Sequence, residues 1–159
     1  NEQSHALFTA ADFLNDNSYS DHALLEVDNF YTWLLNNGFL SSFRAKKTGS
    51  VISVYDQQPF EQIAYGIRPM VSAAIDAYIH TGEDKYADMA GRIASWLLGN
   101  NRASAVMYSV STGICFDAIA PGNAVNRNSG AESTIEALLT MQAITDLPVV
   151  KAALLKYKK

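Results

Sequence analysis

The sequence predicts an all-α protein built from helical hairpins, and three observations lead to this prediction. Apolar residues return every third or fourth position along most of the 159 residues, which is the helical period. Apolar residues make up 48% of the chain and charged residues 18%, a composition typical of a globular domain with a buried core. The interruptions are short groups of Gly, Asn, Asp and Ser, which end helices and form turns. We therefore expect six helices.

The first two helices form the first expected hairpin. The first covers about residues 2–15, and the polar run 15–18 ends it. The second begins at Asp21, because Ser20 is a favourable N-cap residue. The run 36–38, Asn-Asn-Gly, supplies the turn that commonly follows a helix C-terminus.

The third helix is expected from about Pro59 to His80, where apolar positions hold the helical spacing for five turns. Pro59 suits the first helical position, because its missing N–H group has no helical partner there. Pro69 lies inside the expected helix and is predicted to kink it near Gly66.

The remaining chain is expected to contain three more helices and one long irregular segment. The fourth helix stops at residues 99–101, Gly-Asn-Asn. The helical period then breaks, and two short apolar runs predict a small β-hairpin within the loop 102–120. The fifth helix covers residues 131–145, and Pro148 opens the sixth.

The lengths of the connections indicate where function is concentrated. Three connections are short, at 15–20, 81–83 and 145–147, and two are long, at 38–58 and 101–130. In an up-and-down arrangement, alternate connections share one end of the molecule. Both long loops are therefore predicted to lie at the same end, where binding and catalytic residues usually lie.

Each long loop leads into an expected helix start that is rich in carboxylates, amides and aromatic residues. This mixture suits a sugar, because amides and carboxylates bond hydroxyl groups and aromatic rings stack on the C–H surface. Two carboxylates facing across a cleft are also what glycoside hydrolysis requires. Each of these residues also has a structural explanation. Asp56 or Ser129 could cap a helix, and Glu61 and Glu132 could interact with a helix dipole. Arg127 could form an ion pair with Glu132.

Composition excludes several other classes of function. Twelve basic and sixteen acidic residues give a net charge of −4, which argues against nucleic-acid binding through a basic patch. The three histidines lack metal-ligand spacing, no nucleotide-binding motif is present, and we expect no metal and no cofactor. The single Cys115 excludes an intramolecular disulfide and favours a reducing, cytoplasmic location. No apolar run reaches the roughly 18 residues of a membrane span.

Several segments resemble a known class of proteins, and the run 126–134 is the most specific of them. The matching segments are Gln57-Gln58-Pro59, residues 77–86, residues 96–101, residues 112–117 and residues 125–134. Together they resemble bacterial and archaeal six-hairpin glycosidase-like proteins of the (α/α)6-toroid class, which are often described as glycosyltransferases or glycosidase-related proteins. The resemblance covers about residues 50–147 and implies a helical toroid with a sugar-binding cleft at the long-loop end. It places the family's motif positions at Gln58, Asp117, Asn126, Asn128 and Glu132.

We therefore expect residues 1–159 to be a single helical domain, the C-terminal half of a larger (α/α)6 toroid. Half a toroid exposes apolar flanks, so we expect either self-association or a missing N-terminal half. The expected function is that of a carbohydrate-active module of glycoside hydrolase type, acting on or binding an oligosaccharide or glycan. Asp117 and Glu132 are the leading acid and base candidates, followed by Asp56 and Glu61. The residues expected to position the sugar are Gln58, Tyr108, Asn126, Arg127 and Asn128.

Two other functions remain open at this point. The chain is alternatively a non-catalytic module that binds glycan or scaffolds a glycosyltransferase. A helical protein–protein interaction domain of solenoid type is the weaker alternative, because the expected hairpins share no fixed period.

Overall fold

The computed structural model describes residues 2–159 and contains both helices and strands. The α-helices are α1 (Glu2–Leu14), α2 (Asn17–Glu26), α3 (Thr32–Asn37), α4 (Ile67–Thr81), α5 (Asp84–Ala94), α6 (Ala131–Thr145) and α7 (Pro148–Tyr157). The strands are β1 (Ser42–Thr48), β2 (Val51–Gln58), β3 (Gln62–Ile63), β4 (Ala118–Ala120) and β5 (Ala124–Asn126). The expectation of an all-α protein is therefore wrong. The chain is a small mixed α/β domain with two antiparallel sheets and 17% strand, and 159 residues are too few for an (α/α)6 toroid.

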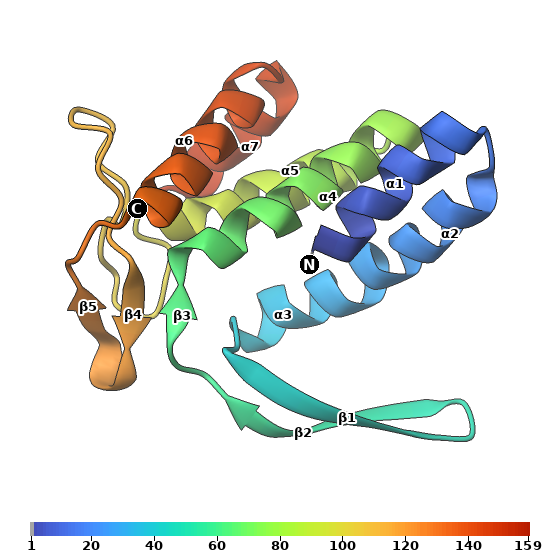
Figure 1. Cartoon of the computed structure of the whole chain (residues 1–159), viewed down its shortest axis with the longest axis horizontal. Coiled ribbons are helices and arrows are strands. Elements are labelled where there is room, and N and C mark those ends of the chain that lie inside the picture. The colour runs from blue at the N-terminus through green and yellow to red at the C-terminus, as the bar shows by residue number, and fades with distance from the viewer. Residues whose placement is uncertain (1) are drawn as a thin grey trace.

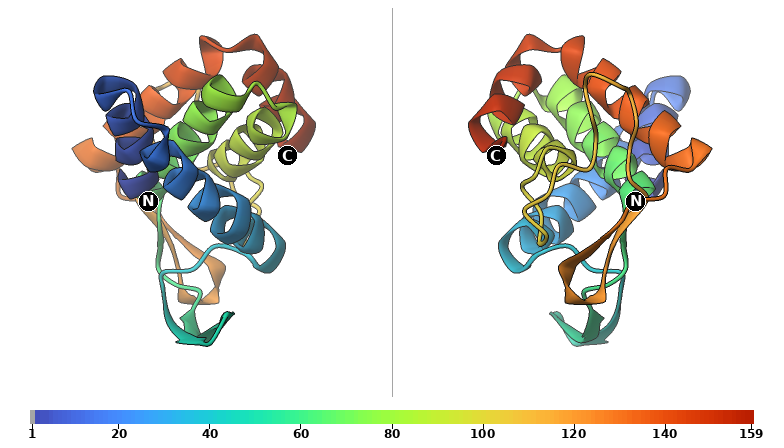
Figure 2. Two further views of the ribbon diagram at one scale, coloured as in Figure 1. Left: turned by 90° about the vertical axis from the view of Figure 1, so that its right-hand side faces the viewer. Right: turned by 90° about the vertical axis from the view of Figure 1, so that its left-hand side faces the viewer.

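Consecutive helices fold back on one another, α1 with α2, α4 with α5 and α6 with α7, and the last two are bent by 117° (Figures 1 and 2). Helix α1 contacts α2 and α4, α4 also contacts α5 and α6, and α5 contacts α7. In Figure 1 the short turns between paired helices lie at the upper right, whereas the three-stranded sheet and the base of the two-stranded sheet lie at the lower left. The two long connections thus share one end, as their lengths predict.

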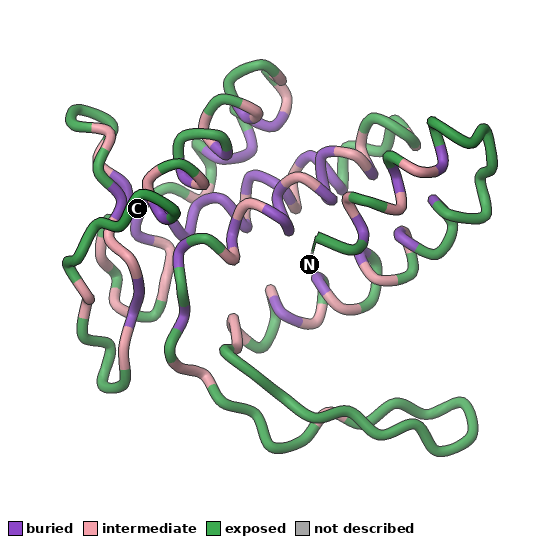
Figure 3. Tube along the Cα trace, in the orientation of Figure 1, coloured by how far each residue is buried: buried purple, intermediate pink, exposed green. Residues whose placement is uncertain are grey.

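The core lies between the paired helices, where the facing sides are buried (Figure 3). Its largest fully buried side chains include Trp96, Tyr31 and Tyr86. Gln62 is a buried polar residue at the edge of this core. Its amide accepts a hydrogen bond from Trp96 Nε1–H at 3.0 Å and donates one to the carbonyl of Phe39 at 2.8 Å. Burial of this amide is therefore compensated by two hydrogen bonds.

The second helical segment begins earlier than the sequence predicts. Helix α2 starts at Asn17, because the Asp16 carboxylate caps it by accepting the Ser18 N–H at 2.9 Å. Ser20 is not a cap, and its hydroxyl donates to the carbonyl of Asn17. A π-helical turn, Val27–Tyr31, joins α2 to α3, and the segment ends at Gly38 as predicted.

The third helix begins later than the sequence predicts. Residues 62–63 pair with β4 rather than forming helix, a 3₁₀ turn follows at Ala64–Gly66, and α4 starts at Ile67. The predicted start at Pro59 is therefore wrong, and so is the predicted kink at Pro69. Pro69 lies in the first turn of α4, where backbone N–H groups have no helical acceptor and proline is tolerated.

The first sheet is a two-stranded hairpin that leaves the helical body, here called the arm (residues 42–58; Figure 1). Its register pairs Arg44 with Tyr55 and Thr48 with Val51. Nearly all of its residues are exposed (Figure 3), and its tip turns at Gly49, whose φ of 62° suits a residue without a side chain. The sequence predicts only a long loop for this segment, and no strands.

The second sheet has the strand order β3-β4-β5 and joins the arm's base to the start of α6. The register pairs Ile63 with Ala118 and Ala118 with Asn126. The hairpin predicted in the loop 102–120 is present only as an isolated antiparallel bridge between Tyr108 and Cys115. The true strand pair β4–β5 lies next to it and was not predicted. Within residues 2–159, no single helix is long and apolar enough to cross a membrane, and α6 with α7 has the required length and hydropathy only as a pair bent by 117°.

Candidate functional site

The structure brings Asp117 and Glu132 to one hollow of about 260 Å³, here called the carboxylate cleft. The cleft lies where the second sheet meets the N-terminus of α6. Two further predicted residues, Glu61 and Asn126, also line it. The remaining lining residues are Ile63, Tyr65, Ala118, Gly130 and Ser133. Three carboxylates and one side-chain amide, from three separate segments of the chain, therefore face the same space.

Asp117 is held in place by hydrogen bonds through three of its groups. Its backbone N–H donates to the carbonyl of Asn128 at 2.9 Å, and its carbonyl accepts the N–H of Ala64 at 2.8 Å. Its carboxylate Oδ1 accepts the N–H of Gly130 at 2.8 Å, next to the start of α6. A Cβ atom on Gly130 would lie 3.4 Å from this oxygen, an ordinary van der Waals contact, so the carboxylate packs closely against the backbone at this position. The backbone therefore fixes the orientation of Asp117.

Glu61 and Glu132 differ from Asp117 in being exposed and without partners. Neither side chain makes a hydrogen bond or an ion pair with any group in residues 2–159. The alternative ion pair between Arg127 and Glu132 is not formed. The Arg127 guanidinium lies instead over the Phe116 ring, 5.6 Å from its centroid. Both glutamates are therefore free to contact a ligand.

Two predicted residues lie on the arm and do not line the carboxylate cleft. Asp56 and Gln58 both belong to β2, where they are exposed. Asp56 pairs with Arg44 at 3.3 Å and accepts a hydrogen bond from the Gln58 amide at 3.3 Å. Their polar groups therefore bond within the arm.

Two other predicted residues, Tyr108 and Asn128, do not line the cleft. Tyr108 is 6% exposed and lies in the core, where its backbone bonds to Leu97. Asn128 shapes the loop through its backbone, because its carbonyl accepts the Asp117 N–H and its own N–H donates to Asn126 Oδ1 at 3.1 Å. No pattern in the sequence separates these two residues from those that line the cleft.

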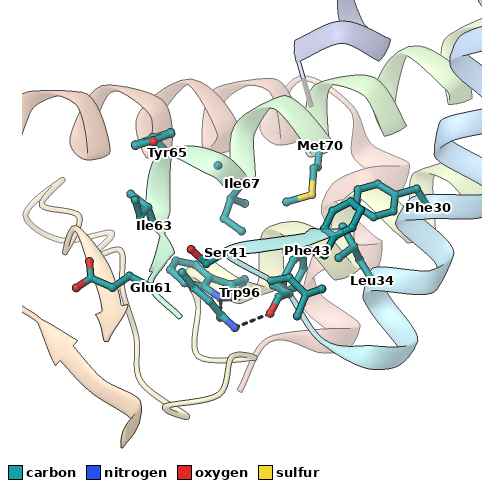
Figure 4. A pocket seen from close by; sticks show the side chains of 14 residues that line it. Phe30, Leu34, Ser41, Phe43, Glu61, Ile63, Tyr65, Ile67, Met70 and Trp96 are labelled. Atoms are coloured by element: carbon teal, nitrogen blue, oxygen red, sulfur yellow. Dashed lines mark hydrogen bonds between the residues drawn. The ribbon is translucent and has the colours of Figure 1, made fainter. Parts of the chain in front are cut away.

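A second hollow, here called the aromatic pocket, adjoins the carboxylate cleft and has a volume of about 280 Å³. Figure 4 shows Phe30 and Phe43 on one side, Tyr65 and Ile63 on the other, and Met70 pointing inward. The sequence does not predict this pocket, because its residues come from the π-helical turn Val27–Tyr31, the arm, β3 and α4. A signal was present in the aromatic residues gathered at Phe30, Phe39 and Phe43.

The two hollows share one wall. Glu61, Ile63 and Tyr65 line both of them. In β3 the side chains of Gln62 and Ile63 point to opposite faces, and Gln62 is buried whereas Ile63 is exposed. Tyr65 follows in the 3₁₀ turn, next to the buried Ala64. The segment around β3 therefore forms the boundary between a polar and an aromatic space.

A larger hollow of about 700 Å³ lies between α1 and α4, away from both sheets. Its carboxylates include Asp76, which bonds His5 Nδ1 at 2.5 Å. Burial raises the pKa of Asp76, although its hydrogen bond to His5 acts in the opposite direction. Because this carboxylate is already paired, the hollow is a weaker candidate than the carboxylate cleft.

The described residues include no cluster of metal ligands and no reactive thiol. Within residues 2–159, no three His, Cys, Asp or Glu side chains are placed to hold a metal ion together. Cys115 is fully buried, and burial together with the nearby charge of Asp117 raises the pKa of its thiol to about 12. A thiol in this environment is not a nucleophile at neutral pH.

Comparison with known proteins does not identify a family. No protein-family model matches the chain, and no curated protein is detectably similar to it in sequence. The resemblance to six-hairpin proteins therefore stays a sequence-based interpretation, and the toroid that it implies is contradicted by the fold.

Proposed function

We propose that the carboxylate cleft binds a glycan and that Asp117 and Glu132 form the carboxylate pair of a glycoside hydrolase. The observation that supports this proposal is the meeting of Asp117, Glu132 and Glu61 with the Asn126 amide in one hollow beside the Tyr65 ring. A sugar presents hydroxyl groups around its edge and C–H groups on its faces. Carboxylate and amide oxygens accept hydrogen bonds from the hydroxyls, and a tyrosine ring packs against the C–H face.

The two carboxylates have environments suited to different roles. Asp117 is oriented by the Gly130 N–H, as a nucleophile or general base must be to reach the anomeric carbon or its attacking water. Glu132 is exposed and free of partners, so its carboxyl group can exchange a proton with the leaving oxygen. This chemistry requires no metal and no cofactor.

A second candidate function is glycan binding without hydrolysis, including a scaffolding role beside a glycosyltransferase. One observation favours it: Asp117 Oδ1 already accepts the Gly130 N–H next to the start of α6, which is a structural task. In this case Glu132, Glu61 and Asn126 would bond sugar hydroxyls, and no bond would be broken.

The test compares binding and hydrolysis in matched variants. Calorimetric titration and a reducing-end assay would be run on a panel of oligosaccharides with the full chain and with Glu132→Gln, Asp117→Asn and, as the control outside the cleft, Asp56→Asn. We expect Glu132→Gln to lower the hydrolytic rate by about a hundredfold or more, because general acid–base catalysis contributes at least that factor. Asp56→Asn should leave both binding and rate unchanged.

The outcomes separate the two candidates. Binding that weakens in Asp117→Asn and Glu132→Gln, with no hydrolysis by the unaltered chain, would support the non-catalytic function. Affinities that are the same in all four proteins would reject the carboxylate cleft as the glycan site. The unfolding free energy of each variant should be measured as well, since Asp117→Asn weakens the bond to Gly130.

A further inference from the structure

We propose that the aromatic pocket receives an apolar aglycone, the non-sugar group attached to a glycan whose sugar lies in the carboxylate cleft. This inference rests on the proposed function and specifies its substrate class. The ligand would be a glycoside with an aryl or alkyl group on its anomeric oxygen rather than a free oligosaccharide.

The first argument concerns the buried polar groups of the pocket, those of Gln62 and Trp96, which are already paired with each other or with the backbone. Gln62 donates to the carbonyl of Phe39 and accepts from Trp96 Nε1–H, so both ends of its amide and the indole donor are paired (Figure 4). The free polar side chains, those of Ser41, Glu61 and Tyr65, belong to exposed residues. A sugar ring placed deep in this pocket would lose hydrogen bonds with water and gain none. An apolar group would lose nothing.

The second argument concerns the apolar walls. The Phe30 and Phe43 rings meet with their centroids 5.1 Å apart and their planes tilted by 40°. Met70 adds a flexible thioether side chain beside them (Figure 4). Rings and thioethers pack well against another flat or branched apolar group. A volume of about 280 Å³ lies just below the usual range for sites that bind a whole small molecule, and it suits one such group.

The third argument is the continuity of the two hollows. Because Glu61, Ile63 and Tyr65 line both, a ligand can occupy the carboxylate cleft and the aromatic pocket at once. The junction between its polar and apolar parts would then lie beside this segment. A glycosidic oxygen is the natural position for such a junction, since it joins a hydroxylated ring to a group of any polarity.

The experiment measures affinity for matched glycosides. Calorimetry on the full chain would compare methyl, butyl and phenyl glycosides of the same sugar, over a panel of common hexoses. We expect the phenyl or butyl compound to bind about tenfold to a hundredfold more tightly than the methyl compound, from the apolar area that it buries. A preference for phenyl would indicate an aromatic aglycone, and a preference for butyl a lipid-like one.

Matched variants connect this preference to the pocket. Ser41→Trp would fill the pocket from its exposed rim, and Ser53→Trp, in the arm and outside the pocket lining, is its control. The advantage of phenyl over methyl should fall below about twofold in Ser41→Trp and persist in Ser53→Trp. Phe43→Ala, which removes one wall, should reduce the advantage as well.

The failure of this inference is distinguishable from the failure of the proposed function. Equal binding of methyl and phenyl glycosides would overturn the inference while the glycan site stands. If no glycoside binds, NMR titration with phenol would decide. A shift of the Met70 methyl signal that is lost in Ser41→Trp would overturn the glycan proposal and support the apolar specificity of the pocket. Absence of this shift would overturn both.

Discussion

Asp117 and Cys115 lie two residues apart, but they differ in burial and therefore in whether their side chains can react with a ligand. The carboxylate of Asp117 reaches the cleft, whereas the thiol of Cys115 points into the core. Cys115 also forms the antiparallel bridge to Tyr108, so its backbone is fixed. The charge of Asp117 adds to burial in disfavouring the thiolate.

Cys115 is therefore predicted to be inert in the folded protein. Its pKa is raised to about 12, so the thiolate fraction at pH 8 should be about a thousandfold lower than for a free thiol, and alkylation of the native protein should be correspondingly slow. The same shift in pKa predicts a dependence of stability on pH. In the unfolded chain the thiol ionises near its ordinary pKa of 9.0. Between pH 9 and pH 12 the folded state keeps the thiol proton that the unfolded state has lost, so the unfolding free energy should fall as the pH rises through this range. Alkylation kinetics and urea unfolding of the protein and of Cys115→Ala would measure both effects. Rapid native alkylation at pH 8, or the same loss of stability in Cys115→Ala, would contradict this account.

At the level of elements, α5 and α7 approach each other closely at Gly91. Gly91 lies on α5 where an added Cβ would come within 2.5 Å of the backbone nitrogen of Leu154 and 2.7 Å of the carbonyl carbon of Ala153. These are backbone atoms, which cannot rotate away as a flexible side chain can. The glycine is thus required by the approach of α7 rather than by its own backbone conformation.

Gly91→Ala is predicted to destabilise the fold by about 3 kcal/mol, because an overpacked contact forces the helices apart. Gly66→Ala is the matched control, since nothing lies within 4 Å of a Cβ added there and its φ of −67° suits any residue. It should change the unfolding free energy by less than about 1 kcal/mol. Urea denaturation would compare the two variants with the parent protein. Equal stabilities would show that α5 and α7 are less closely packed than the structure indicates.

The elements differ in how far the sequence could predict them. Helix α6 begins and ends where predicted, because Gly130 precedes a regular helical period and the turn before Pro148 ends it. The arm was missed because both faces of its strands are exposed, so no apolar alternation marks them. Residues 59–66 have a helical apolar period, but the bonds of Gln62 to Trp96 and Phe39 and the pairing with β4 override it. Such long-range contacts are invisible in local patterns.

The candidate site was predictable to a similar extent. The placement of both long connections at one end follows from their lengths, and it accounts for the meeting of Asp117, Glu132, Glu61 and Asn126. The location of Asp56 in the arm and of Tyr108 in the core depends on strand pairings that the sequence did not reveal.

At the level of the whole molecule, net charge and exposed apolar surface are the two properties from which we predict association. The net charge is −4 and the sequence pI is about 5.2. Helix α6 exposes Ile135, Leu138 and Leu139, and α1 ends in Phe13, whose side chain is 88% exposed. Charge repulsion is the force that opposes contact between such surfaces. We therefore predict that the protein self-associates through these apolar surfaces and that the attraction depends on pH.

Light scattering should show the strongest attraction between molecules near pH 5.2 and the weakest above pH 7, because the net charge vanishes at the pI. Added salt at pH 7.5 should increase attraction by screening the remaining negative charge. Scattering that does not change between pH 5 and pH 8 would contradict a role for net charge.

The arm has a practical consequence for those who work with this protein. Its tip, at Gly49 and Ser50, is held only by the pairing of β1 with β2 and touches neither hollow. Foreign sequence inserted at such an exposed tip leaves the core packing as it is. The tip is therefore a natural attachment point for a fluorophore or an epitope tag, from which ligand-dependent changes at the arm's base could be reported without modifying the site itself.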